Sequence, residues 1–327
     1  MHAITIENDK SLTWSTIPDP VLQADEVLIR VQCAALNRAD LMQRAGDYPP
    51  PPGAPDTMGL EVSGQIVALG EHAAAQSSLH IGDKVCALLG GGGYAEYAAV
   101  KWNHCMPVPA GLSMEEAAVL PEAFATAYLN LVHEGNARPG ETLLFTAGGS
   151  GLGSIAIPLA KVLGLRVITT VSSAKKAQSI ADLGADRIIV TAEESLPAVL
   201  KVEFEAGHGV DLAIDCVGGE IMGQCLPYVN RGARWIMIAA LAGNLTQVDL
   251  KNVYVKGLRI IGSTLRSRPD AFKGQLLANL VQTVWPLIEQ GQIRPRIYQT
   301  LPITEAEAAH AILQRNENIG KVVLRIP

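Results

Sequence analysis

A glycine-rich run, GGSGLG at residues 148–153, lies near the middle of the 327-residue chain. The apolar residues 143–145 precede it, and a helix-length segment with apolar residues at helical spacing follows it. Glycines let the backbone turn sharply and approach a phosphate, and the N-terminus of a following helix presents free N–H groups to that phosphate. The order of strand, glycine turn and helix therefore predicts a dinucleotide site. A tight turn without a ligand is the alternative for any short glycine motif.

The residues about 20 positions after the glycines indicate which dinucleotide would bind. An NAD site usually carries Asp or Glu there, which holds the ribose 2′-hydroxyl. This chain has no acid at that place but has Ser172 and Ser173, followed by Lys175 and Lys176. Hydroxyl and ammonium groups suit a 2′-phosphate, whereas a carboxylate would repel it. The sequence therefore favours NADPH, although a plain serine–lysine helix start has the same pattern.

A second candidate group lies in the first part of the chain. Tyr48 stands directly before four consecutive prolines, residues 49–52. These prolines cannot form a helix, because each lacks an N–H and has a fixed φ. The run is either a stiff surface loop or a rigid lip that holds Tyr48 over a cleft.

The residue pattern indicates neither a metal site nor a hydrolase. None of the seven histidines lies in an HExxH motif or a tight Cys/His cluster, and the adjacent His104 and Cys105 would point in different directions in a strand. The five cysteines are scattered without a CxxC pair, which indicates reduced thiols in a cytoplasmic protein. Ser150 resembles the nucleophile of a GxSxG elbow, but Leu152 stands where that motif needs glycine.

Composition and charge narrow the class of protein further. The chain is 48% hydrophobic and long enough for two domains with a large core. Its net charge of −6 gives no support to binding of nucleic acid or a membrane surface. No apolar run reaches the roughly 18 residues of a membrane span, and the first residues lack the pattern of a signal peptide.

Residues 1 to about 110 read as short strands separated by glycine and proline turns, which suggests a barrel-like module. The expected strands cover residues 26–32, 60–69, 83–89 and 94–100. A helix should begin at Ser113, because Ser113 and Glu116 form a capping-box pattern. We expect this helix to continue to Val132 with a kink at Pro121, as a bridge between two modules.

From residue 141 to about 264, apolar strand candidates alternate with helical patterns, which predicts an α/β fold with a doubly wound parallel sheet of six strands. After the first strand, the other five are expected at residues 165–170, 187–190, 210–215, 233–239 and 258–262, with helices that include residues 174–183 and 196–204. Ligands of such sheets bind at the carboxyl ends of the strands. This rule selects the cleft wall: Ser150, Ser172, Ser173, Cys216, Val217, Gly218, Gly219 and residues 239–243.

The last part of the chain should contain a long helix at residues 275–290 and a terminal strand at 319–326. We expect this segment to return to the first module. The predicted domains are therefore residues 1–120, completed by 265–327, and residues 121–264.

Several longer motifs together carry a family resemblance that covers essentially the whole chain. They are ALNRADLMQR at 35–44, YPPPPGAP at 48–55, GLEVSG at 59–64, GDKVCALL at 82–89, GGGYAEYA at 91–98, AGGSGLG at 147–153, DCVGG at 215–219, LRSR at 265–268 and NIGKVVL at 318–324. With these motifs the chain resembles the zinc-independent medium-chain dehydrogenase/reductases of the quinone oxidoreductase group. It looks closest to the p53-inducible quinone oxidoreductase branch.

This resemblance implies a GroES-like catalytic domain, a Rossmann domain that binds NADPH, and a homodimer joined through the Rossmann sheets. It also implies that no metal is bound. Zinc-dependent relatives have Cys where Asn37 stands, and His where Leu60 precedes Glu61.

The resemblance also assigns site residues. Asn37 and Tyr48 would face the nicotinamide and the quinone pocket, and Asn318 would lie near the nicotinamide end. The implied cofactor-binding set further comprises Thr126 and Val217 along the cleft, Ser150, Gly151, Leu152 and Gly153 at the pyrophosphate, and Ser173 and Lys176 at the 2′-phosphate. Thr191 is a departure, because relatives often have a Tyr there beside the adenosine.

The expected activity is hydride transfer from NADPH to a small-molecule quinone, with Tyr48 positioned to hydrogen-bond the quinone oxygen. A quinone needs little acid catalysis, because its ring stabilises the reduced oxygens and water can protonate them. One alternative is an NADPH-dependent reductase of enals, enones or enoyl thioesters, which must deliver a proton to the α carbon. A non-catalytic NADPH-binding protein is the other alternative.

Overall fold

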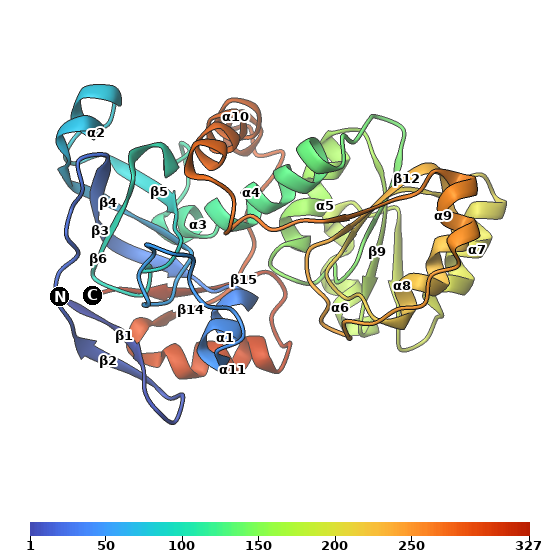
Figure 1. Cartoon of the computed structure of the whole chain (residues 1–327), viewed down its shortest axis with the longest axis horizontal. Coiled ribbons are helices and arrows are strands. Elements are labelled where there is room, and N and C mark those ends of the chain that lie inside the picture. The colour runs from blue at the N-terminus through green and yellow to red at the C-terminus, as the bar shows by residue number, and fades with distance from the viewer. The chain divides into compact units, whose positions relative to one another are not determined.

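The computed structural model describes all residues, Met1 to Pro327, and divides the chain into two compact units. The first unit comprises Met1–Ala125 and Leu265–Pro327, and the second comprises Thr126–Thr264. The division falls within helix α4 (Pro121–Tyr128) (Figure 1). The chain therefore leaves the first unit, builds the second, and returns.

The second unit is built on one parallel sheet. Its strands are β8 (Thr142–Phe145), β9 (Arg166–Val171), β10 (Arg187–Val190), β11 (Val210–Asp215), β12 (Val229–Met237) and β13 (Arg259–Gly262). Their order is β10-β9-β8-β11-β12-β13, so the chain reverses direction across the sheet between β8 and β11. This arrangement confirms the predicted doubly wound sheet, whose ligands bind outside the strand ends at the reversal point. All four residues of β8 are buried, as expected for a strand that is covered on both faces.

Short helices connect these strands. They are α5 (Gly153–Val162), α6 (Ala174–Ser179), α7 (Leu196–Glu205), α8 (Glu220–Cys225) and α9 (Leu250–Lys256). The helix expected over residues 174–183 is instead α6 followed by a 3₁₀ turn at Ala181–Leu183. Leu144 of β8, Ile168 of β9 and Trp235 of β12 contribute buried side chains to the core of this unit.

The first unit contains a seven-stranded sheet and a separate hairpin. The hairpin is β1 (His2–Ile6) with β2 (Leu12–Thr16), and the sheet contains β3 (Glu26–Ala35), β4 (Glu61–Leu69), β5 (Lys84–Leu88), β6 (Tyr97–Lys101), β7 (Cys105–Pro107), β14 (Ile297–Pro302) and β15 (Lys321–Arg325). The order is β14-β15-β3-β4-β5-β7, and β6 also pairs with β3. The last strand, β15, runs antiparallel beside β3 (Figure 1). Residues from both ends of the chain therefore share one sheet.

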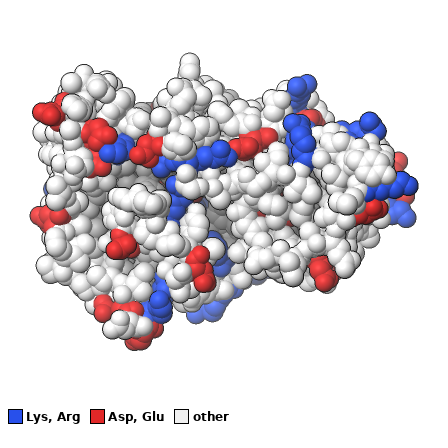
Figure 2. All heavy atoms as spheres, in the orientation of Figure 1, with Lys and Arg blue, Asp and Glu red and all other residues white.

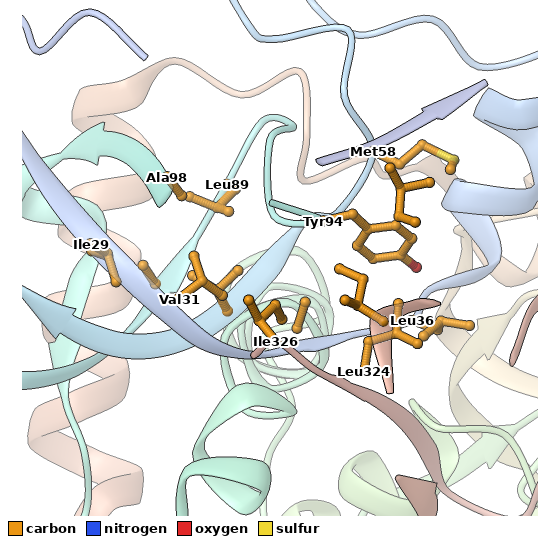
Figure 3. Packing of buried hydrophobic residues seen from close by; sticks show 14 of the residues in the cluster. Ile29, Val31, Leu36, Met58, Leu89, Tyr94, Ala98, Leu324 and Ile326 are labelled. Atoms are coloured by element: carbon orange, nitrogen blue, oxygen red, sulfur yellow. The ribbon is translucent and has the colours of Figure 1, made fainter. Parts of the chain in front are cut away.

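The core of the first unit follows from the alternation in β3. Val27, Ile29 and Val31 are buried while Arg30 is exposed, as the sequence pattern predicts. Figure 3 shows Val31 of β3 near Ile326, which follows β15, and Tyr94, which precedes β6, near Leu36 and Leu324. Because these side chains come from distant parts of the sequence, the core holds the N-terminal and C-terminal segments together.

The helices of the first unit are α1 (Arg38–Ala45), α2 (Glu71–Gln76), α3 (Met114–Ala118), α10 (Asp270–Glu289) and α11 (Ala306–Gln314). The helix expected at residues 275–290 is α10, which begins earlier, at Asp270. With 20 residues α10 is the longest helix, and no helix combines the length and apolar content that a membrane span requires. None of the five cysteines forms a disulfide. On the face shown in Figure 2, basic and acidic side chains are interspersed over a largely uncharged surface.

The helix predicted from Ser113 to Val132 is partly wrong. Its start is confirmed, because Ser113 and Glu116 form the reciprocal capping bonds at 3.2 and 2.8 Å. However, α3 ends at Ala118, and Pro121 starts a new helix instead of kinking the first one. Proline lacks the N–H that an interior helical position donates, but it fits the first position of a helix. A π-helical segment, Leu129–Glu134, then continues the chain.

His310 on α11 is a buried titratable group without polar contacts. Neither ring nitrogen has a hydrogen-bond partner, and the ring packs edge-on against Tyr94 with 5.9 Å between centroids. Burial lowers the pKa of His310 from 6.5 to about 4. The unfolded chain therefore takes up a proton at this residue below about pH 6.5, while the folded chain does so only near pH 4. Stability from this residue is present at neutral pH and is lost as the pH falls through that window.

The substitution His310→Leu should remove this acid sensitivity. Between pH 7 and 4.5, we expect the free energy of unfolding to fall by about 2.5 kcal/mol less in the variant than in the parent protein. Urea unfolding at both pH values measures the difference. His208→Leu, at an exposed position, is the control and should keep the parental pH dependence. Equal pH dependence in the parent and the His310 variant would contradict the assignment.

Candidate functional site

The glycine-rich loop joins β8 to α5 in the second unit, and close packing explains two of its glycines. A Cβ at Gly148 would lie 2.3 Å from Thr169 Oγ1, and a Cβ at Gly153 would lie 2.5 Å from the carbonyl oxygen of Gly148. Both distances are shorter than real contacts allow. Glycine at these positions lets the loop lie against β9 and lets α5 begin directly against the loop.

The loop presents unused hydrogen-bond donors at the start of α5. Ser150 Oγ accepts the N–H of Gly153 at 3.0 Å, and Ser154 Oγ donates to the carbonyl of Gly151 at 2.8 Å. The N–H groups of Gly151 and Leu152 make no hydrogen bond within the protein. Free N–H groups at a helix N-terminus fit an anion such as a pyrophosphate. The role of residues 150–153 at the pyrophosphate stays a prediction.

The structure brings two other predicted cofactor residues to the same edge of the sheet. Ser173 caps α6, because its hydroxyl accepts the N–H of Lys176 at 3.3 Å. A Cβ at Gly149 would lie 3.6 Å from Lys176 Cδ, so the Lys176 side chain passes beside the glycine loop. Thr191, after β10, donates its hydroxyl to the carbonyl of Val171 at 3.2 Å. The Lys176 side chain therefore lies beside the glycine loop, and Ser173 caps the helix that carries it; their contact with a 2′-phosphate stays a prediction.

Asp215, at the carboxyl end of β11, holds the turn that follows this strand. This turn lies across from the glycine-rich loop, at the point where the strand order reverses between β8 and β11. The buried carboxylate of Asp215 accepts hydrogen bonds from Thr146 Oγ1 at 3.0 Å, from the N–H groups of Val217 at 2.8 Å and Gly218 at 3.1 Å, and from Trp235 Nε1 at 3.1 Å. This role was not predicted from the sequence. An Asp that ends an apolar strand directly before a glycine turn was the available signal. The predicted residue Val217 is thus held by its backbone and not by its side chain.

In the first unit, Asn37 is held at both ends of its amide. Asn37 Nδ2 donates to Glu61 Oε1 at 3.0 Å, and Asn37 Oδ1 accepts from Lys321 Nζ at 2.7 Å. Lys321 and Glu61 form a buried ion pair at 2.6 Å. The remaining bonds satisfy the pair: Lys321 donates to the carbonyl of Leu36 at 2.8 Å, and Glu61 Oε2 accepts the N–H of Glu122 at 2.9 Å. The amide of Asn37 cannot rotate without breaking this network.

The same residues show why a zinc ion does not fit here. The resemblance places zinc ligands at positions 37 and 60, but Asn37 supplies an amide and Leu60 is a buried core side chain. The ammonium of Lys321 already neutralises the carboxylate of Glu61. No group of three or more His, Cys, Asp or Glu side chains in the chain is arranged so that it could hold a metal ion. Zinc independence itself stays a prediction.

Asp40 secures the start of α1. Asp40 Oδ2 accepts the N–H of Asn37 at 2.7 Å and the hydroxyl of Tyr94 at 3.0 Å, and Oδ1 accepts the N–H of Gly59 at 3.3 Å. Burial raises the pKa of Asp40 from 3.8 to about 6. Three donors around one carboxyl group therefore connect Asn37, the backbone at Gly59 just before β4, and the buried side chain of Tyr94.

Tyr48 lies half-buried in the turn before the proline run. The guanidinium of Arg266 stacks on its ring at 5.0 Å, and Arg266 Nη1 donates to the carbonyl of Tyr48 at 3.3 Å. Burial raises the pKa of the Tyr48 phenol, the charge of Glu122 raises it further, and Arg266 opposes them. The phenol hydroxyl has no hydrogen-bond partner in the protein. A Cβ at Gly90 would lie 3.0 Å from Ala54, so the proline segment packs against another loop, which favours the rigid-lip interpretation.

The two remaining predicted site residues occupy ordinary structural positions. Thr126 on α4 accepts the side-chain N–H of Asn130 at its carbonyl, at 2.8 Å. Asn318 precedes β15 and donates to the carbonyl of Gly320 at 2.7 Å. The structure thus groups the glycine loop with Ser173 and Lys176, and separately groups Asn37 with Glu61 and Lys321. Glu61, Lys321 and Arg266, like Asp40 and Asp215, are polar residues of the site that were not selected from the sequence.

Two family models match the chain. One, described as an alcohol dehydrogenase GroES-like domain, matches residues 23–110, and the other, described as a zinc-binding dehydrogenase, matches residues 151–282. The first lies in the strand-rich unit, and the second covers most of the parallel-sheet unit. The predicted fold class, a GroES-like domain with a Rossmann-type parallel sheet, is therefore confirmed.

Among curated proteins, the chain is 29% identical to the quinone oxidoreductase-like protein 2 homolog of Nematostella vectensis, over 93% of this chain and 82% of that protein. Among solved structures, it is similar to the quinone oxidoreductase of Thermus thermophilus, solved also in complex with NADPH, with a TM-score of 0.83, 31% identity and coverage of 99% of this chain and 100% of that chain. It is also similar to the CurK enoyl reductase, with a TM-score of 0.86, 26% identity and coverage of 100% and 99%.

The substitution Lys321→Met should destabilise the protein by about 3 kcal/mol or more, because it leaves the buried carboxylate of Glu61 unpaired. Urea unfolding measures the loss, and the double variant Glu61→Gln/Lys321→Met should recover much of it. Lys101→Met is the matched control, since its pair with Asp25 is partly exposed and should contribute less than about 1 kcal/mol. Equal losses for the two lysine variants would contradict a buried charge network.

Proposed function

Because the chain belongs to the quinone oxidoreductase group of the medium-chain dehydrogenase/reductase family, we propose that it is an NADPH-dependent oxidoreductase that reduces a quinone. The cofactor part is supported by the position of Lys176, on the helix that Ser173 caps, beside a loop in which the N–H groups of Gly151 and Leu152 are free. Membership of the p53-inducible branch stays a prediction.

The residues fit the cofactor in two places. The N–H groups of Gly151 and Leu152, with Ser150 and Gly153 shaping the loop, would hold the pyrophosphate. Ser173 and Lys176 would hold the 2′-phosphate, as a charge-assisted contact that NADH cannot make. When bound, NADPH supplies the hydride. Thr126, Val217 and Asn318 are proposed to line the rest of its site.

The first unit would orient the substrate. The amide of Asn37 is fixed by Glu61 and Lys321, so it offers a rigid polar group without a cost for ordering it. A phenol is protonated at neutral pH, and burial raises the pKa of Tyr48 further, so its hydroxyl can donate a hydrogen bond to an acceptor oxygen. A quinone needs no more than this, because its ring stabilises the reduced oxygens and water supplies the protons.

Double-bond reduction is the second candidate. It is supported by the similarity to the CurK enoyl reductase and by the protonated phenol of Tyr48. An enal or enone requires a proton at the α carbon after the hydride is added, and a phenol is a reasonable donor. The two candidates share one cofactor site and differ only in the acceptor.

Cofactor oxidation with a naphthoquinone and with an α,β-unsaturated aldehyde, each with NADPH and with NADH, tests the proposal. We expect turnover with the quinone and NADPH. Turnover with the aldehyde alone would move the function to double-bond reduction, and tight NADPH binding without turnover would indicate a non-catalytic binding protein.

Lys176→Ala should raise the KM for NADPH about 10- to 100-fold and leave the KM for NADH nearly unchanged. The control is Lys201→Ala, at an exposed position on α7, which should preserve both KM values.

We also propose that two copies associate through β13, at the edge of the parallel sheet. One edge of β13 is unpaired, and Ile260 on this strand is 44% exposed. Further exposed apolar side chains come from the segment between β12 and β13: Leu241, Leu245, Leu250, Tyr254 and Val255. A hollow of about 290 Å³ lined by Met222, Met237, Leu245 and Ile260 among others lies in the same region. An open strand edge with apolar neighbours favours pairing with another strand.

Ile260→Lys should convert a dimer into a monomer at micromolar protein concentration, because the charge would be buried in the paired edge. Light scattering coupled to gel filtration gives the mass directly. Ile81→Lys replaces a side chain that is exposed in the first unit and should leave the mass unchanged. A monomeric parent protein, or a dimeric Ile260 variant, would contradict pairing through β13.

A further inference from the structure

Arg266 is a buried cation whose direct partners are all neutral. Arg266 Nε and Nη2 donate to the carbonyl of Gly90 at 3.0 and 2.8 Å, Nη2 donates to Gln43 Oε1 at 2.7 Å, and Nη1 donates to the carbonyl of Tyr48 at 3.3 Å. The side chain is only 6% exposed. Burial of an unpaired charge is costly, so a fold that keeps one has a use for the charge or for its rigid fork of donors.

The other buried cations show that Arg266 is the exception. Arg234 pairs with Glu141 at 2.7 Å, Lys273 pairs with Asp270 at 3.0 Å, and Lys321 pairs with Glu61. No carboxylate lies within ion-pair distance of Arg266, and the charges of Asp40 and Glu122 act on it only from farther away. The positive charge of Arg266 is therefore less compensated than that of any other buried cation in the chain.

This charge is directed at Tyr48. The guanidinium lies over the aromatic ring at 5.0 Å and also holds the backbone of the same residue. Gly90 and Gln43 hold the guanidinium in place from two other segments. Two charged groups face the Tyr48 phenol: Glu122 raises its pKa and Arg266 lowers it. The phenol hydroxyl, with no partner in the protein, is the group through which this field can reach a ligand.

We propose that Arg266 is a positioning residue that acts through Tyr48, fixing the phenol and strengthening its hydrogen bond to the acceptor oxygen. As the acceptor gains the hydride, its oxygen gains negative charge, and a proton from water completes the reduction. A fixed positive charge behind the donor favours that charged state more than the starting carbonyl, so it accelerates the chemical step. This role rests on the proposed function, in which Tyr48 contacts the acceptor.

A double-mutant cycle separates this role from simple support of the fold. The variants are Tyr48→Phe, Arg266→Met and the combination, assayed with a naphthoquinone at saturating NADPH. We expect each single substitution to lower kcat at least about tenfold. In the Tyr48→Phe background, Arg266→Met should lower kcat less than about twofold, because the hydroxyl through which it acts is gone. Arg266→Lys should recover part of the lost kcat, since it keeps the charge.

A structural role makes a different prediction. If Arg266 only holds the Gly90 and Gln43 segments together, Arg266→Met will cost the same factor with and without the Tyr48 hydroxyl, and this result overturns the proposal. Arg315→Met, at an exposed residue paired with Glu317, should leave kcat unchanged. It shows that loss of one positive charge elsewhere does not mimic the effect.

A second measurement does not depend on turnover. Fluorotyrosine labelling allows the Tyr48 phenol to be titrated by fluorine magnetic resonance, with Tyr48→Phe identifying its signal. Arg266→Met should raise the pKa of the phenol, and an unchanged pKa would overturn the proposed coupling even if the parent protein reduced no quinone. Absence of quinone turnover together with a raised pKa would instead reject the proposed acceptor and retain the coupling between Arg266 and Tyr48.

Discussion

The site in the first unit depends on one buried ion pair, Lys321 with Glu61. A buried pair persists only if its other hydrogen bonds are made, and here the backbone at Leu36 and Glu122 and the amide of Asn37 make them. The pair links β15 to β4 and to the start of α1, which are far apart in the sequence. Because the amide of Asn37 is the third member, the network that stabilises the sheet also orients a candidate site residue.

In the second unit, backbone groups shape the candidate site, where the first unit uses a buried ion pair. Gly148 and Gly153 allow a loop to pack where any side chain would collide, and this packing leaves N–H groups at the start of α5 without partners. Asp215 holds the facing turn through the N–H groups of Val217 and Gly218, and it also accepts hydrogen bonds from Thr146 and Trp235. The result is a strand edge with free donors near Lys176, which suits a ligand with several phosphates.

Arg266 and Lys321 illustrate two uses of a buried positive charge. Lys321 is matched by a carboxylate, so its charge is compensated within the protein and its effect is to hold Asn37 still. Arg266 is bound only by neutral oxygens and stacks on Tyr48, so its field extends to a hydroxyl that the protein leaves unpaired. The contrast explains why one cation stabilises the scaffold while the other is suited to assist chemistry.

The sequence by itself determined the parallel sheet, the glycine loop and the start of α3. The spacing of apolar residues, the glycines of the loop and the capping residues Ser113 and Glu116 each act over a few neighbouring positions. It also selected Asn37, Tyr48, Ser173 and Lys176, partly through family resemblance. Only the tertiary structure decided what holds them. Lys321 and Asn37 lie 284 positions apart, and Arg266 meets Gly90 across 176 positions. Such pairings follow from which strands lie side by side, and local spacing carries no information about that order.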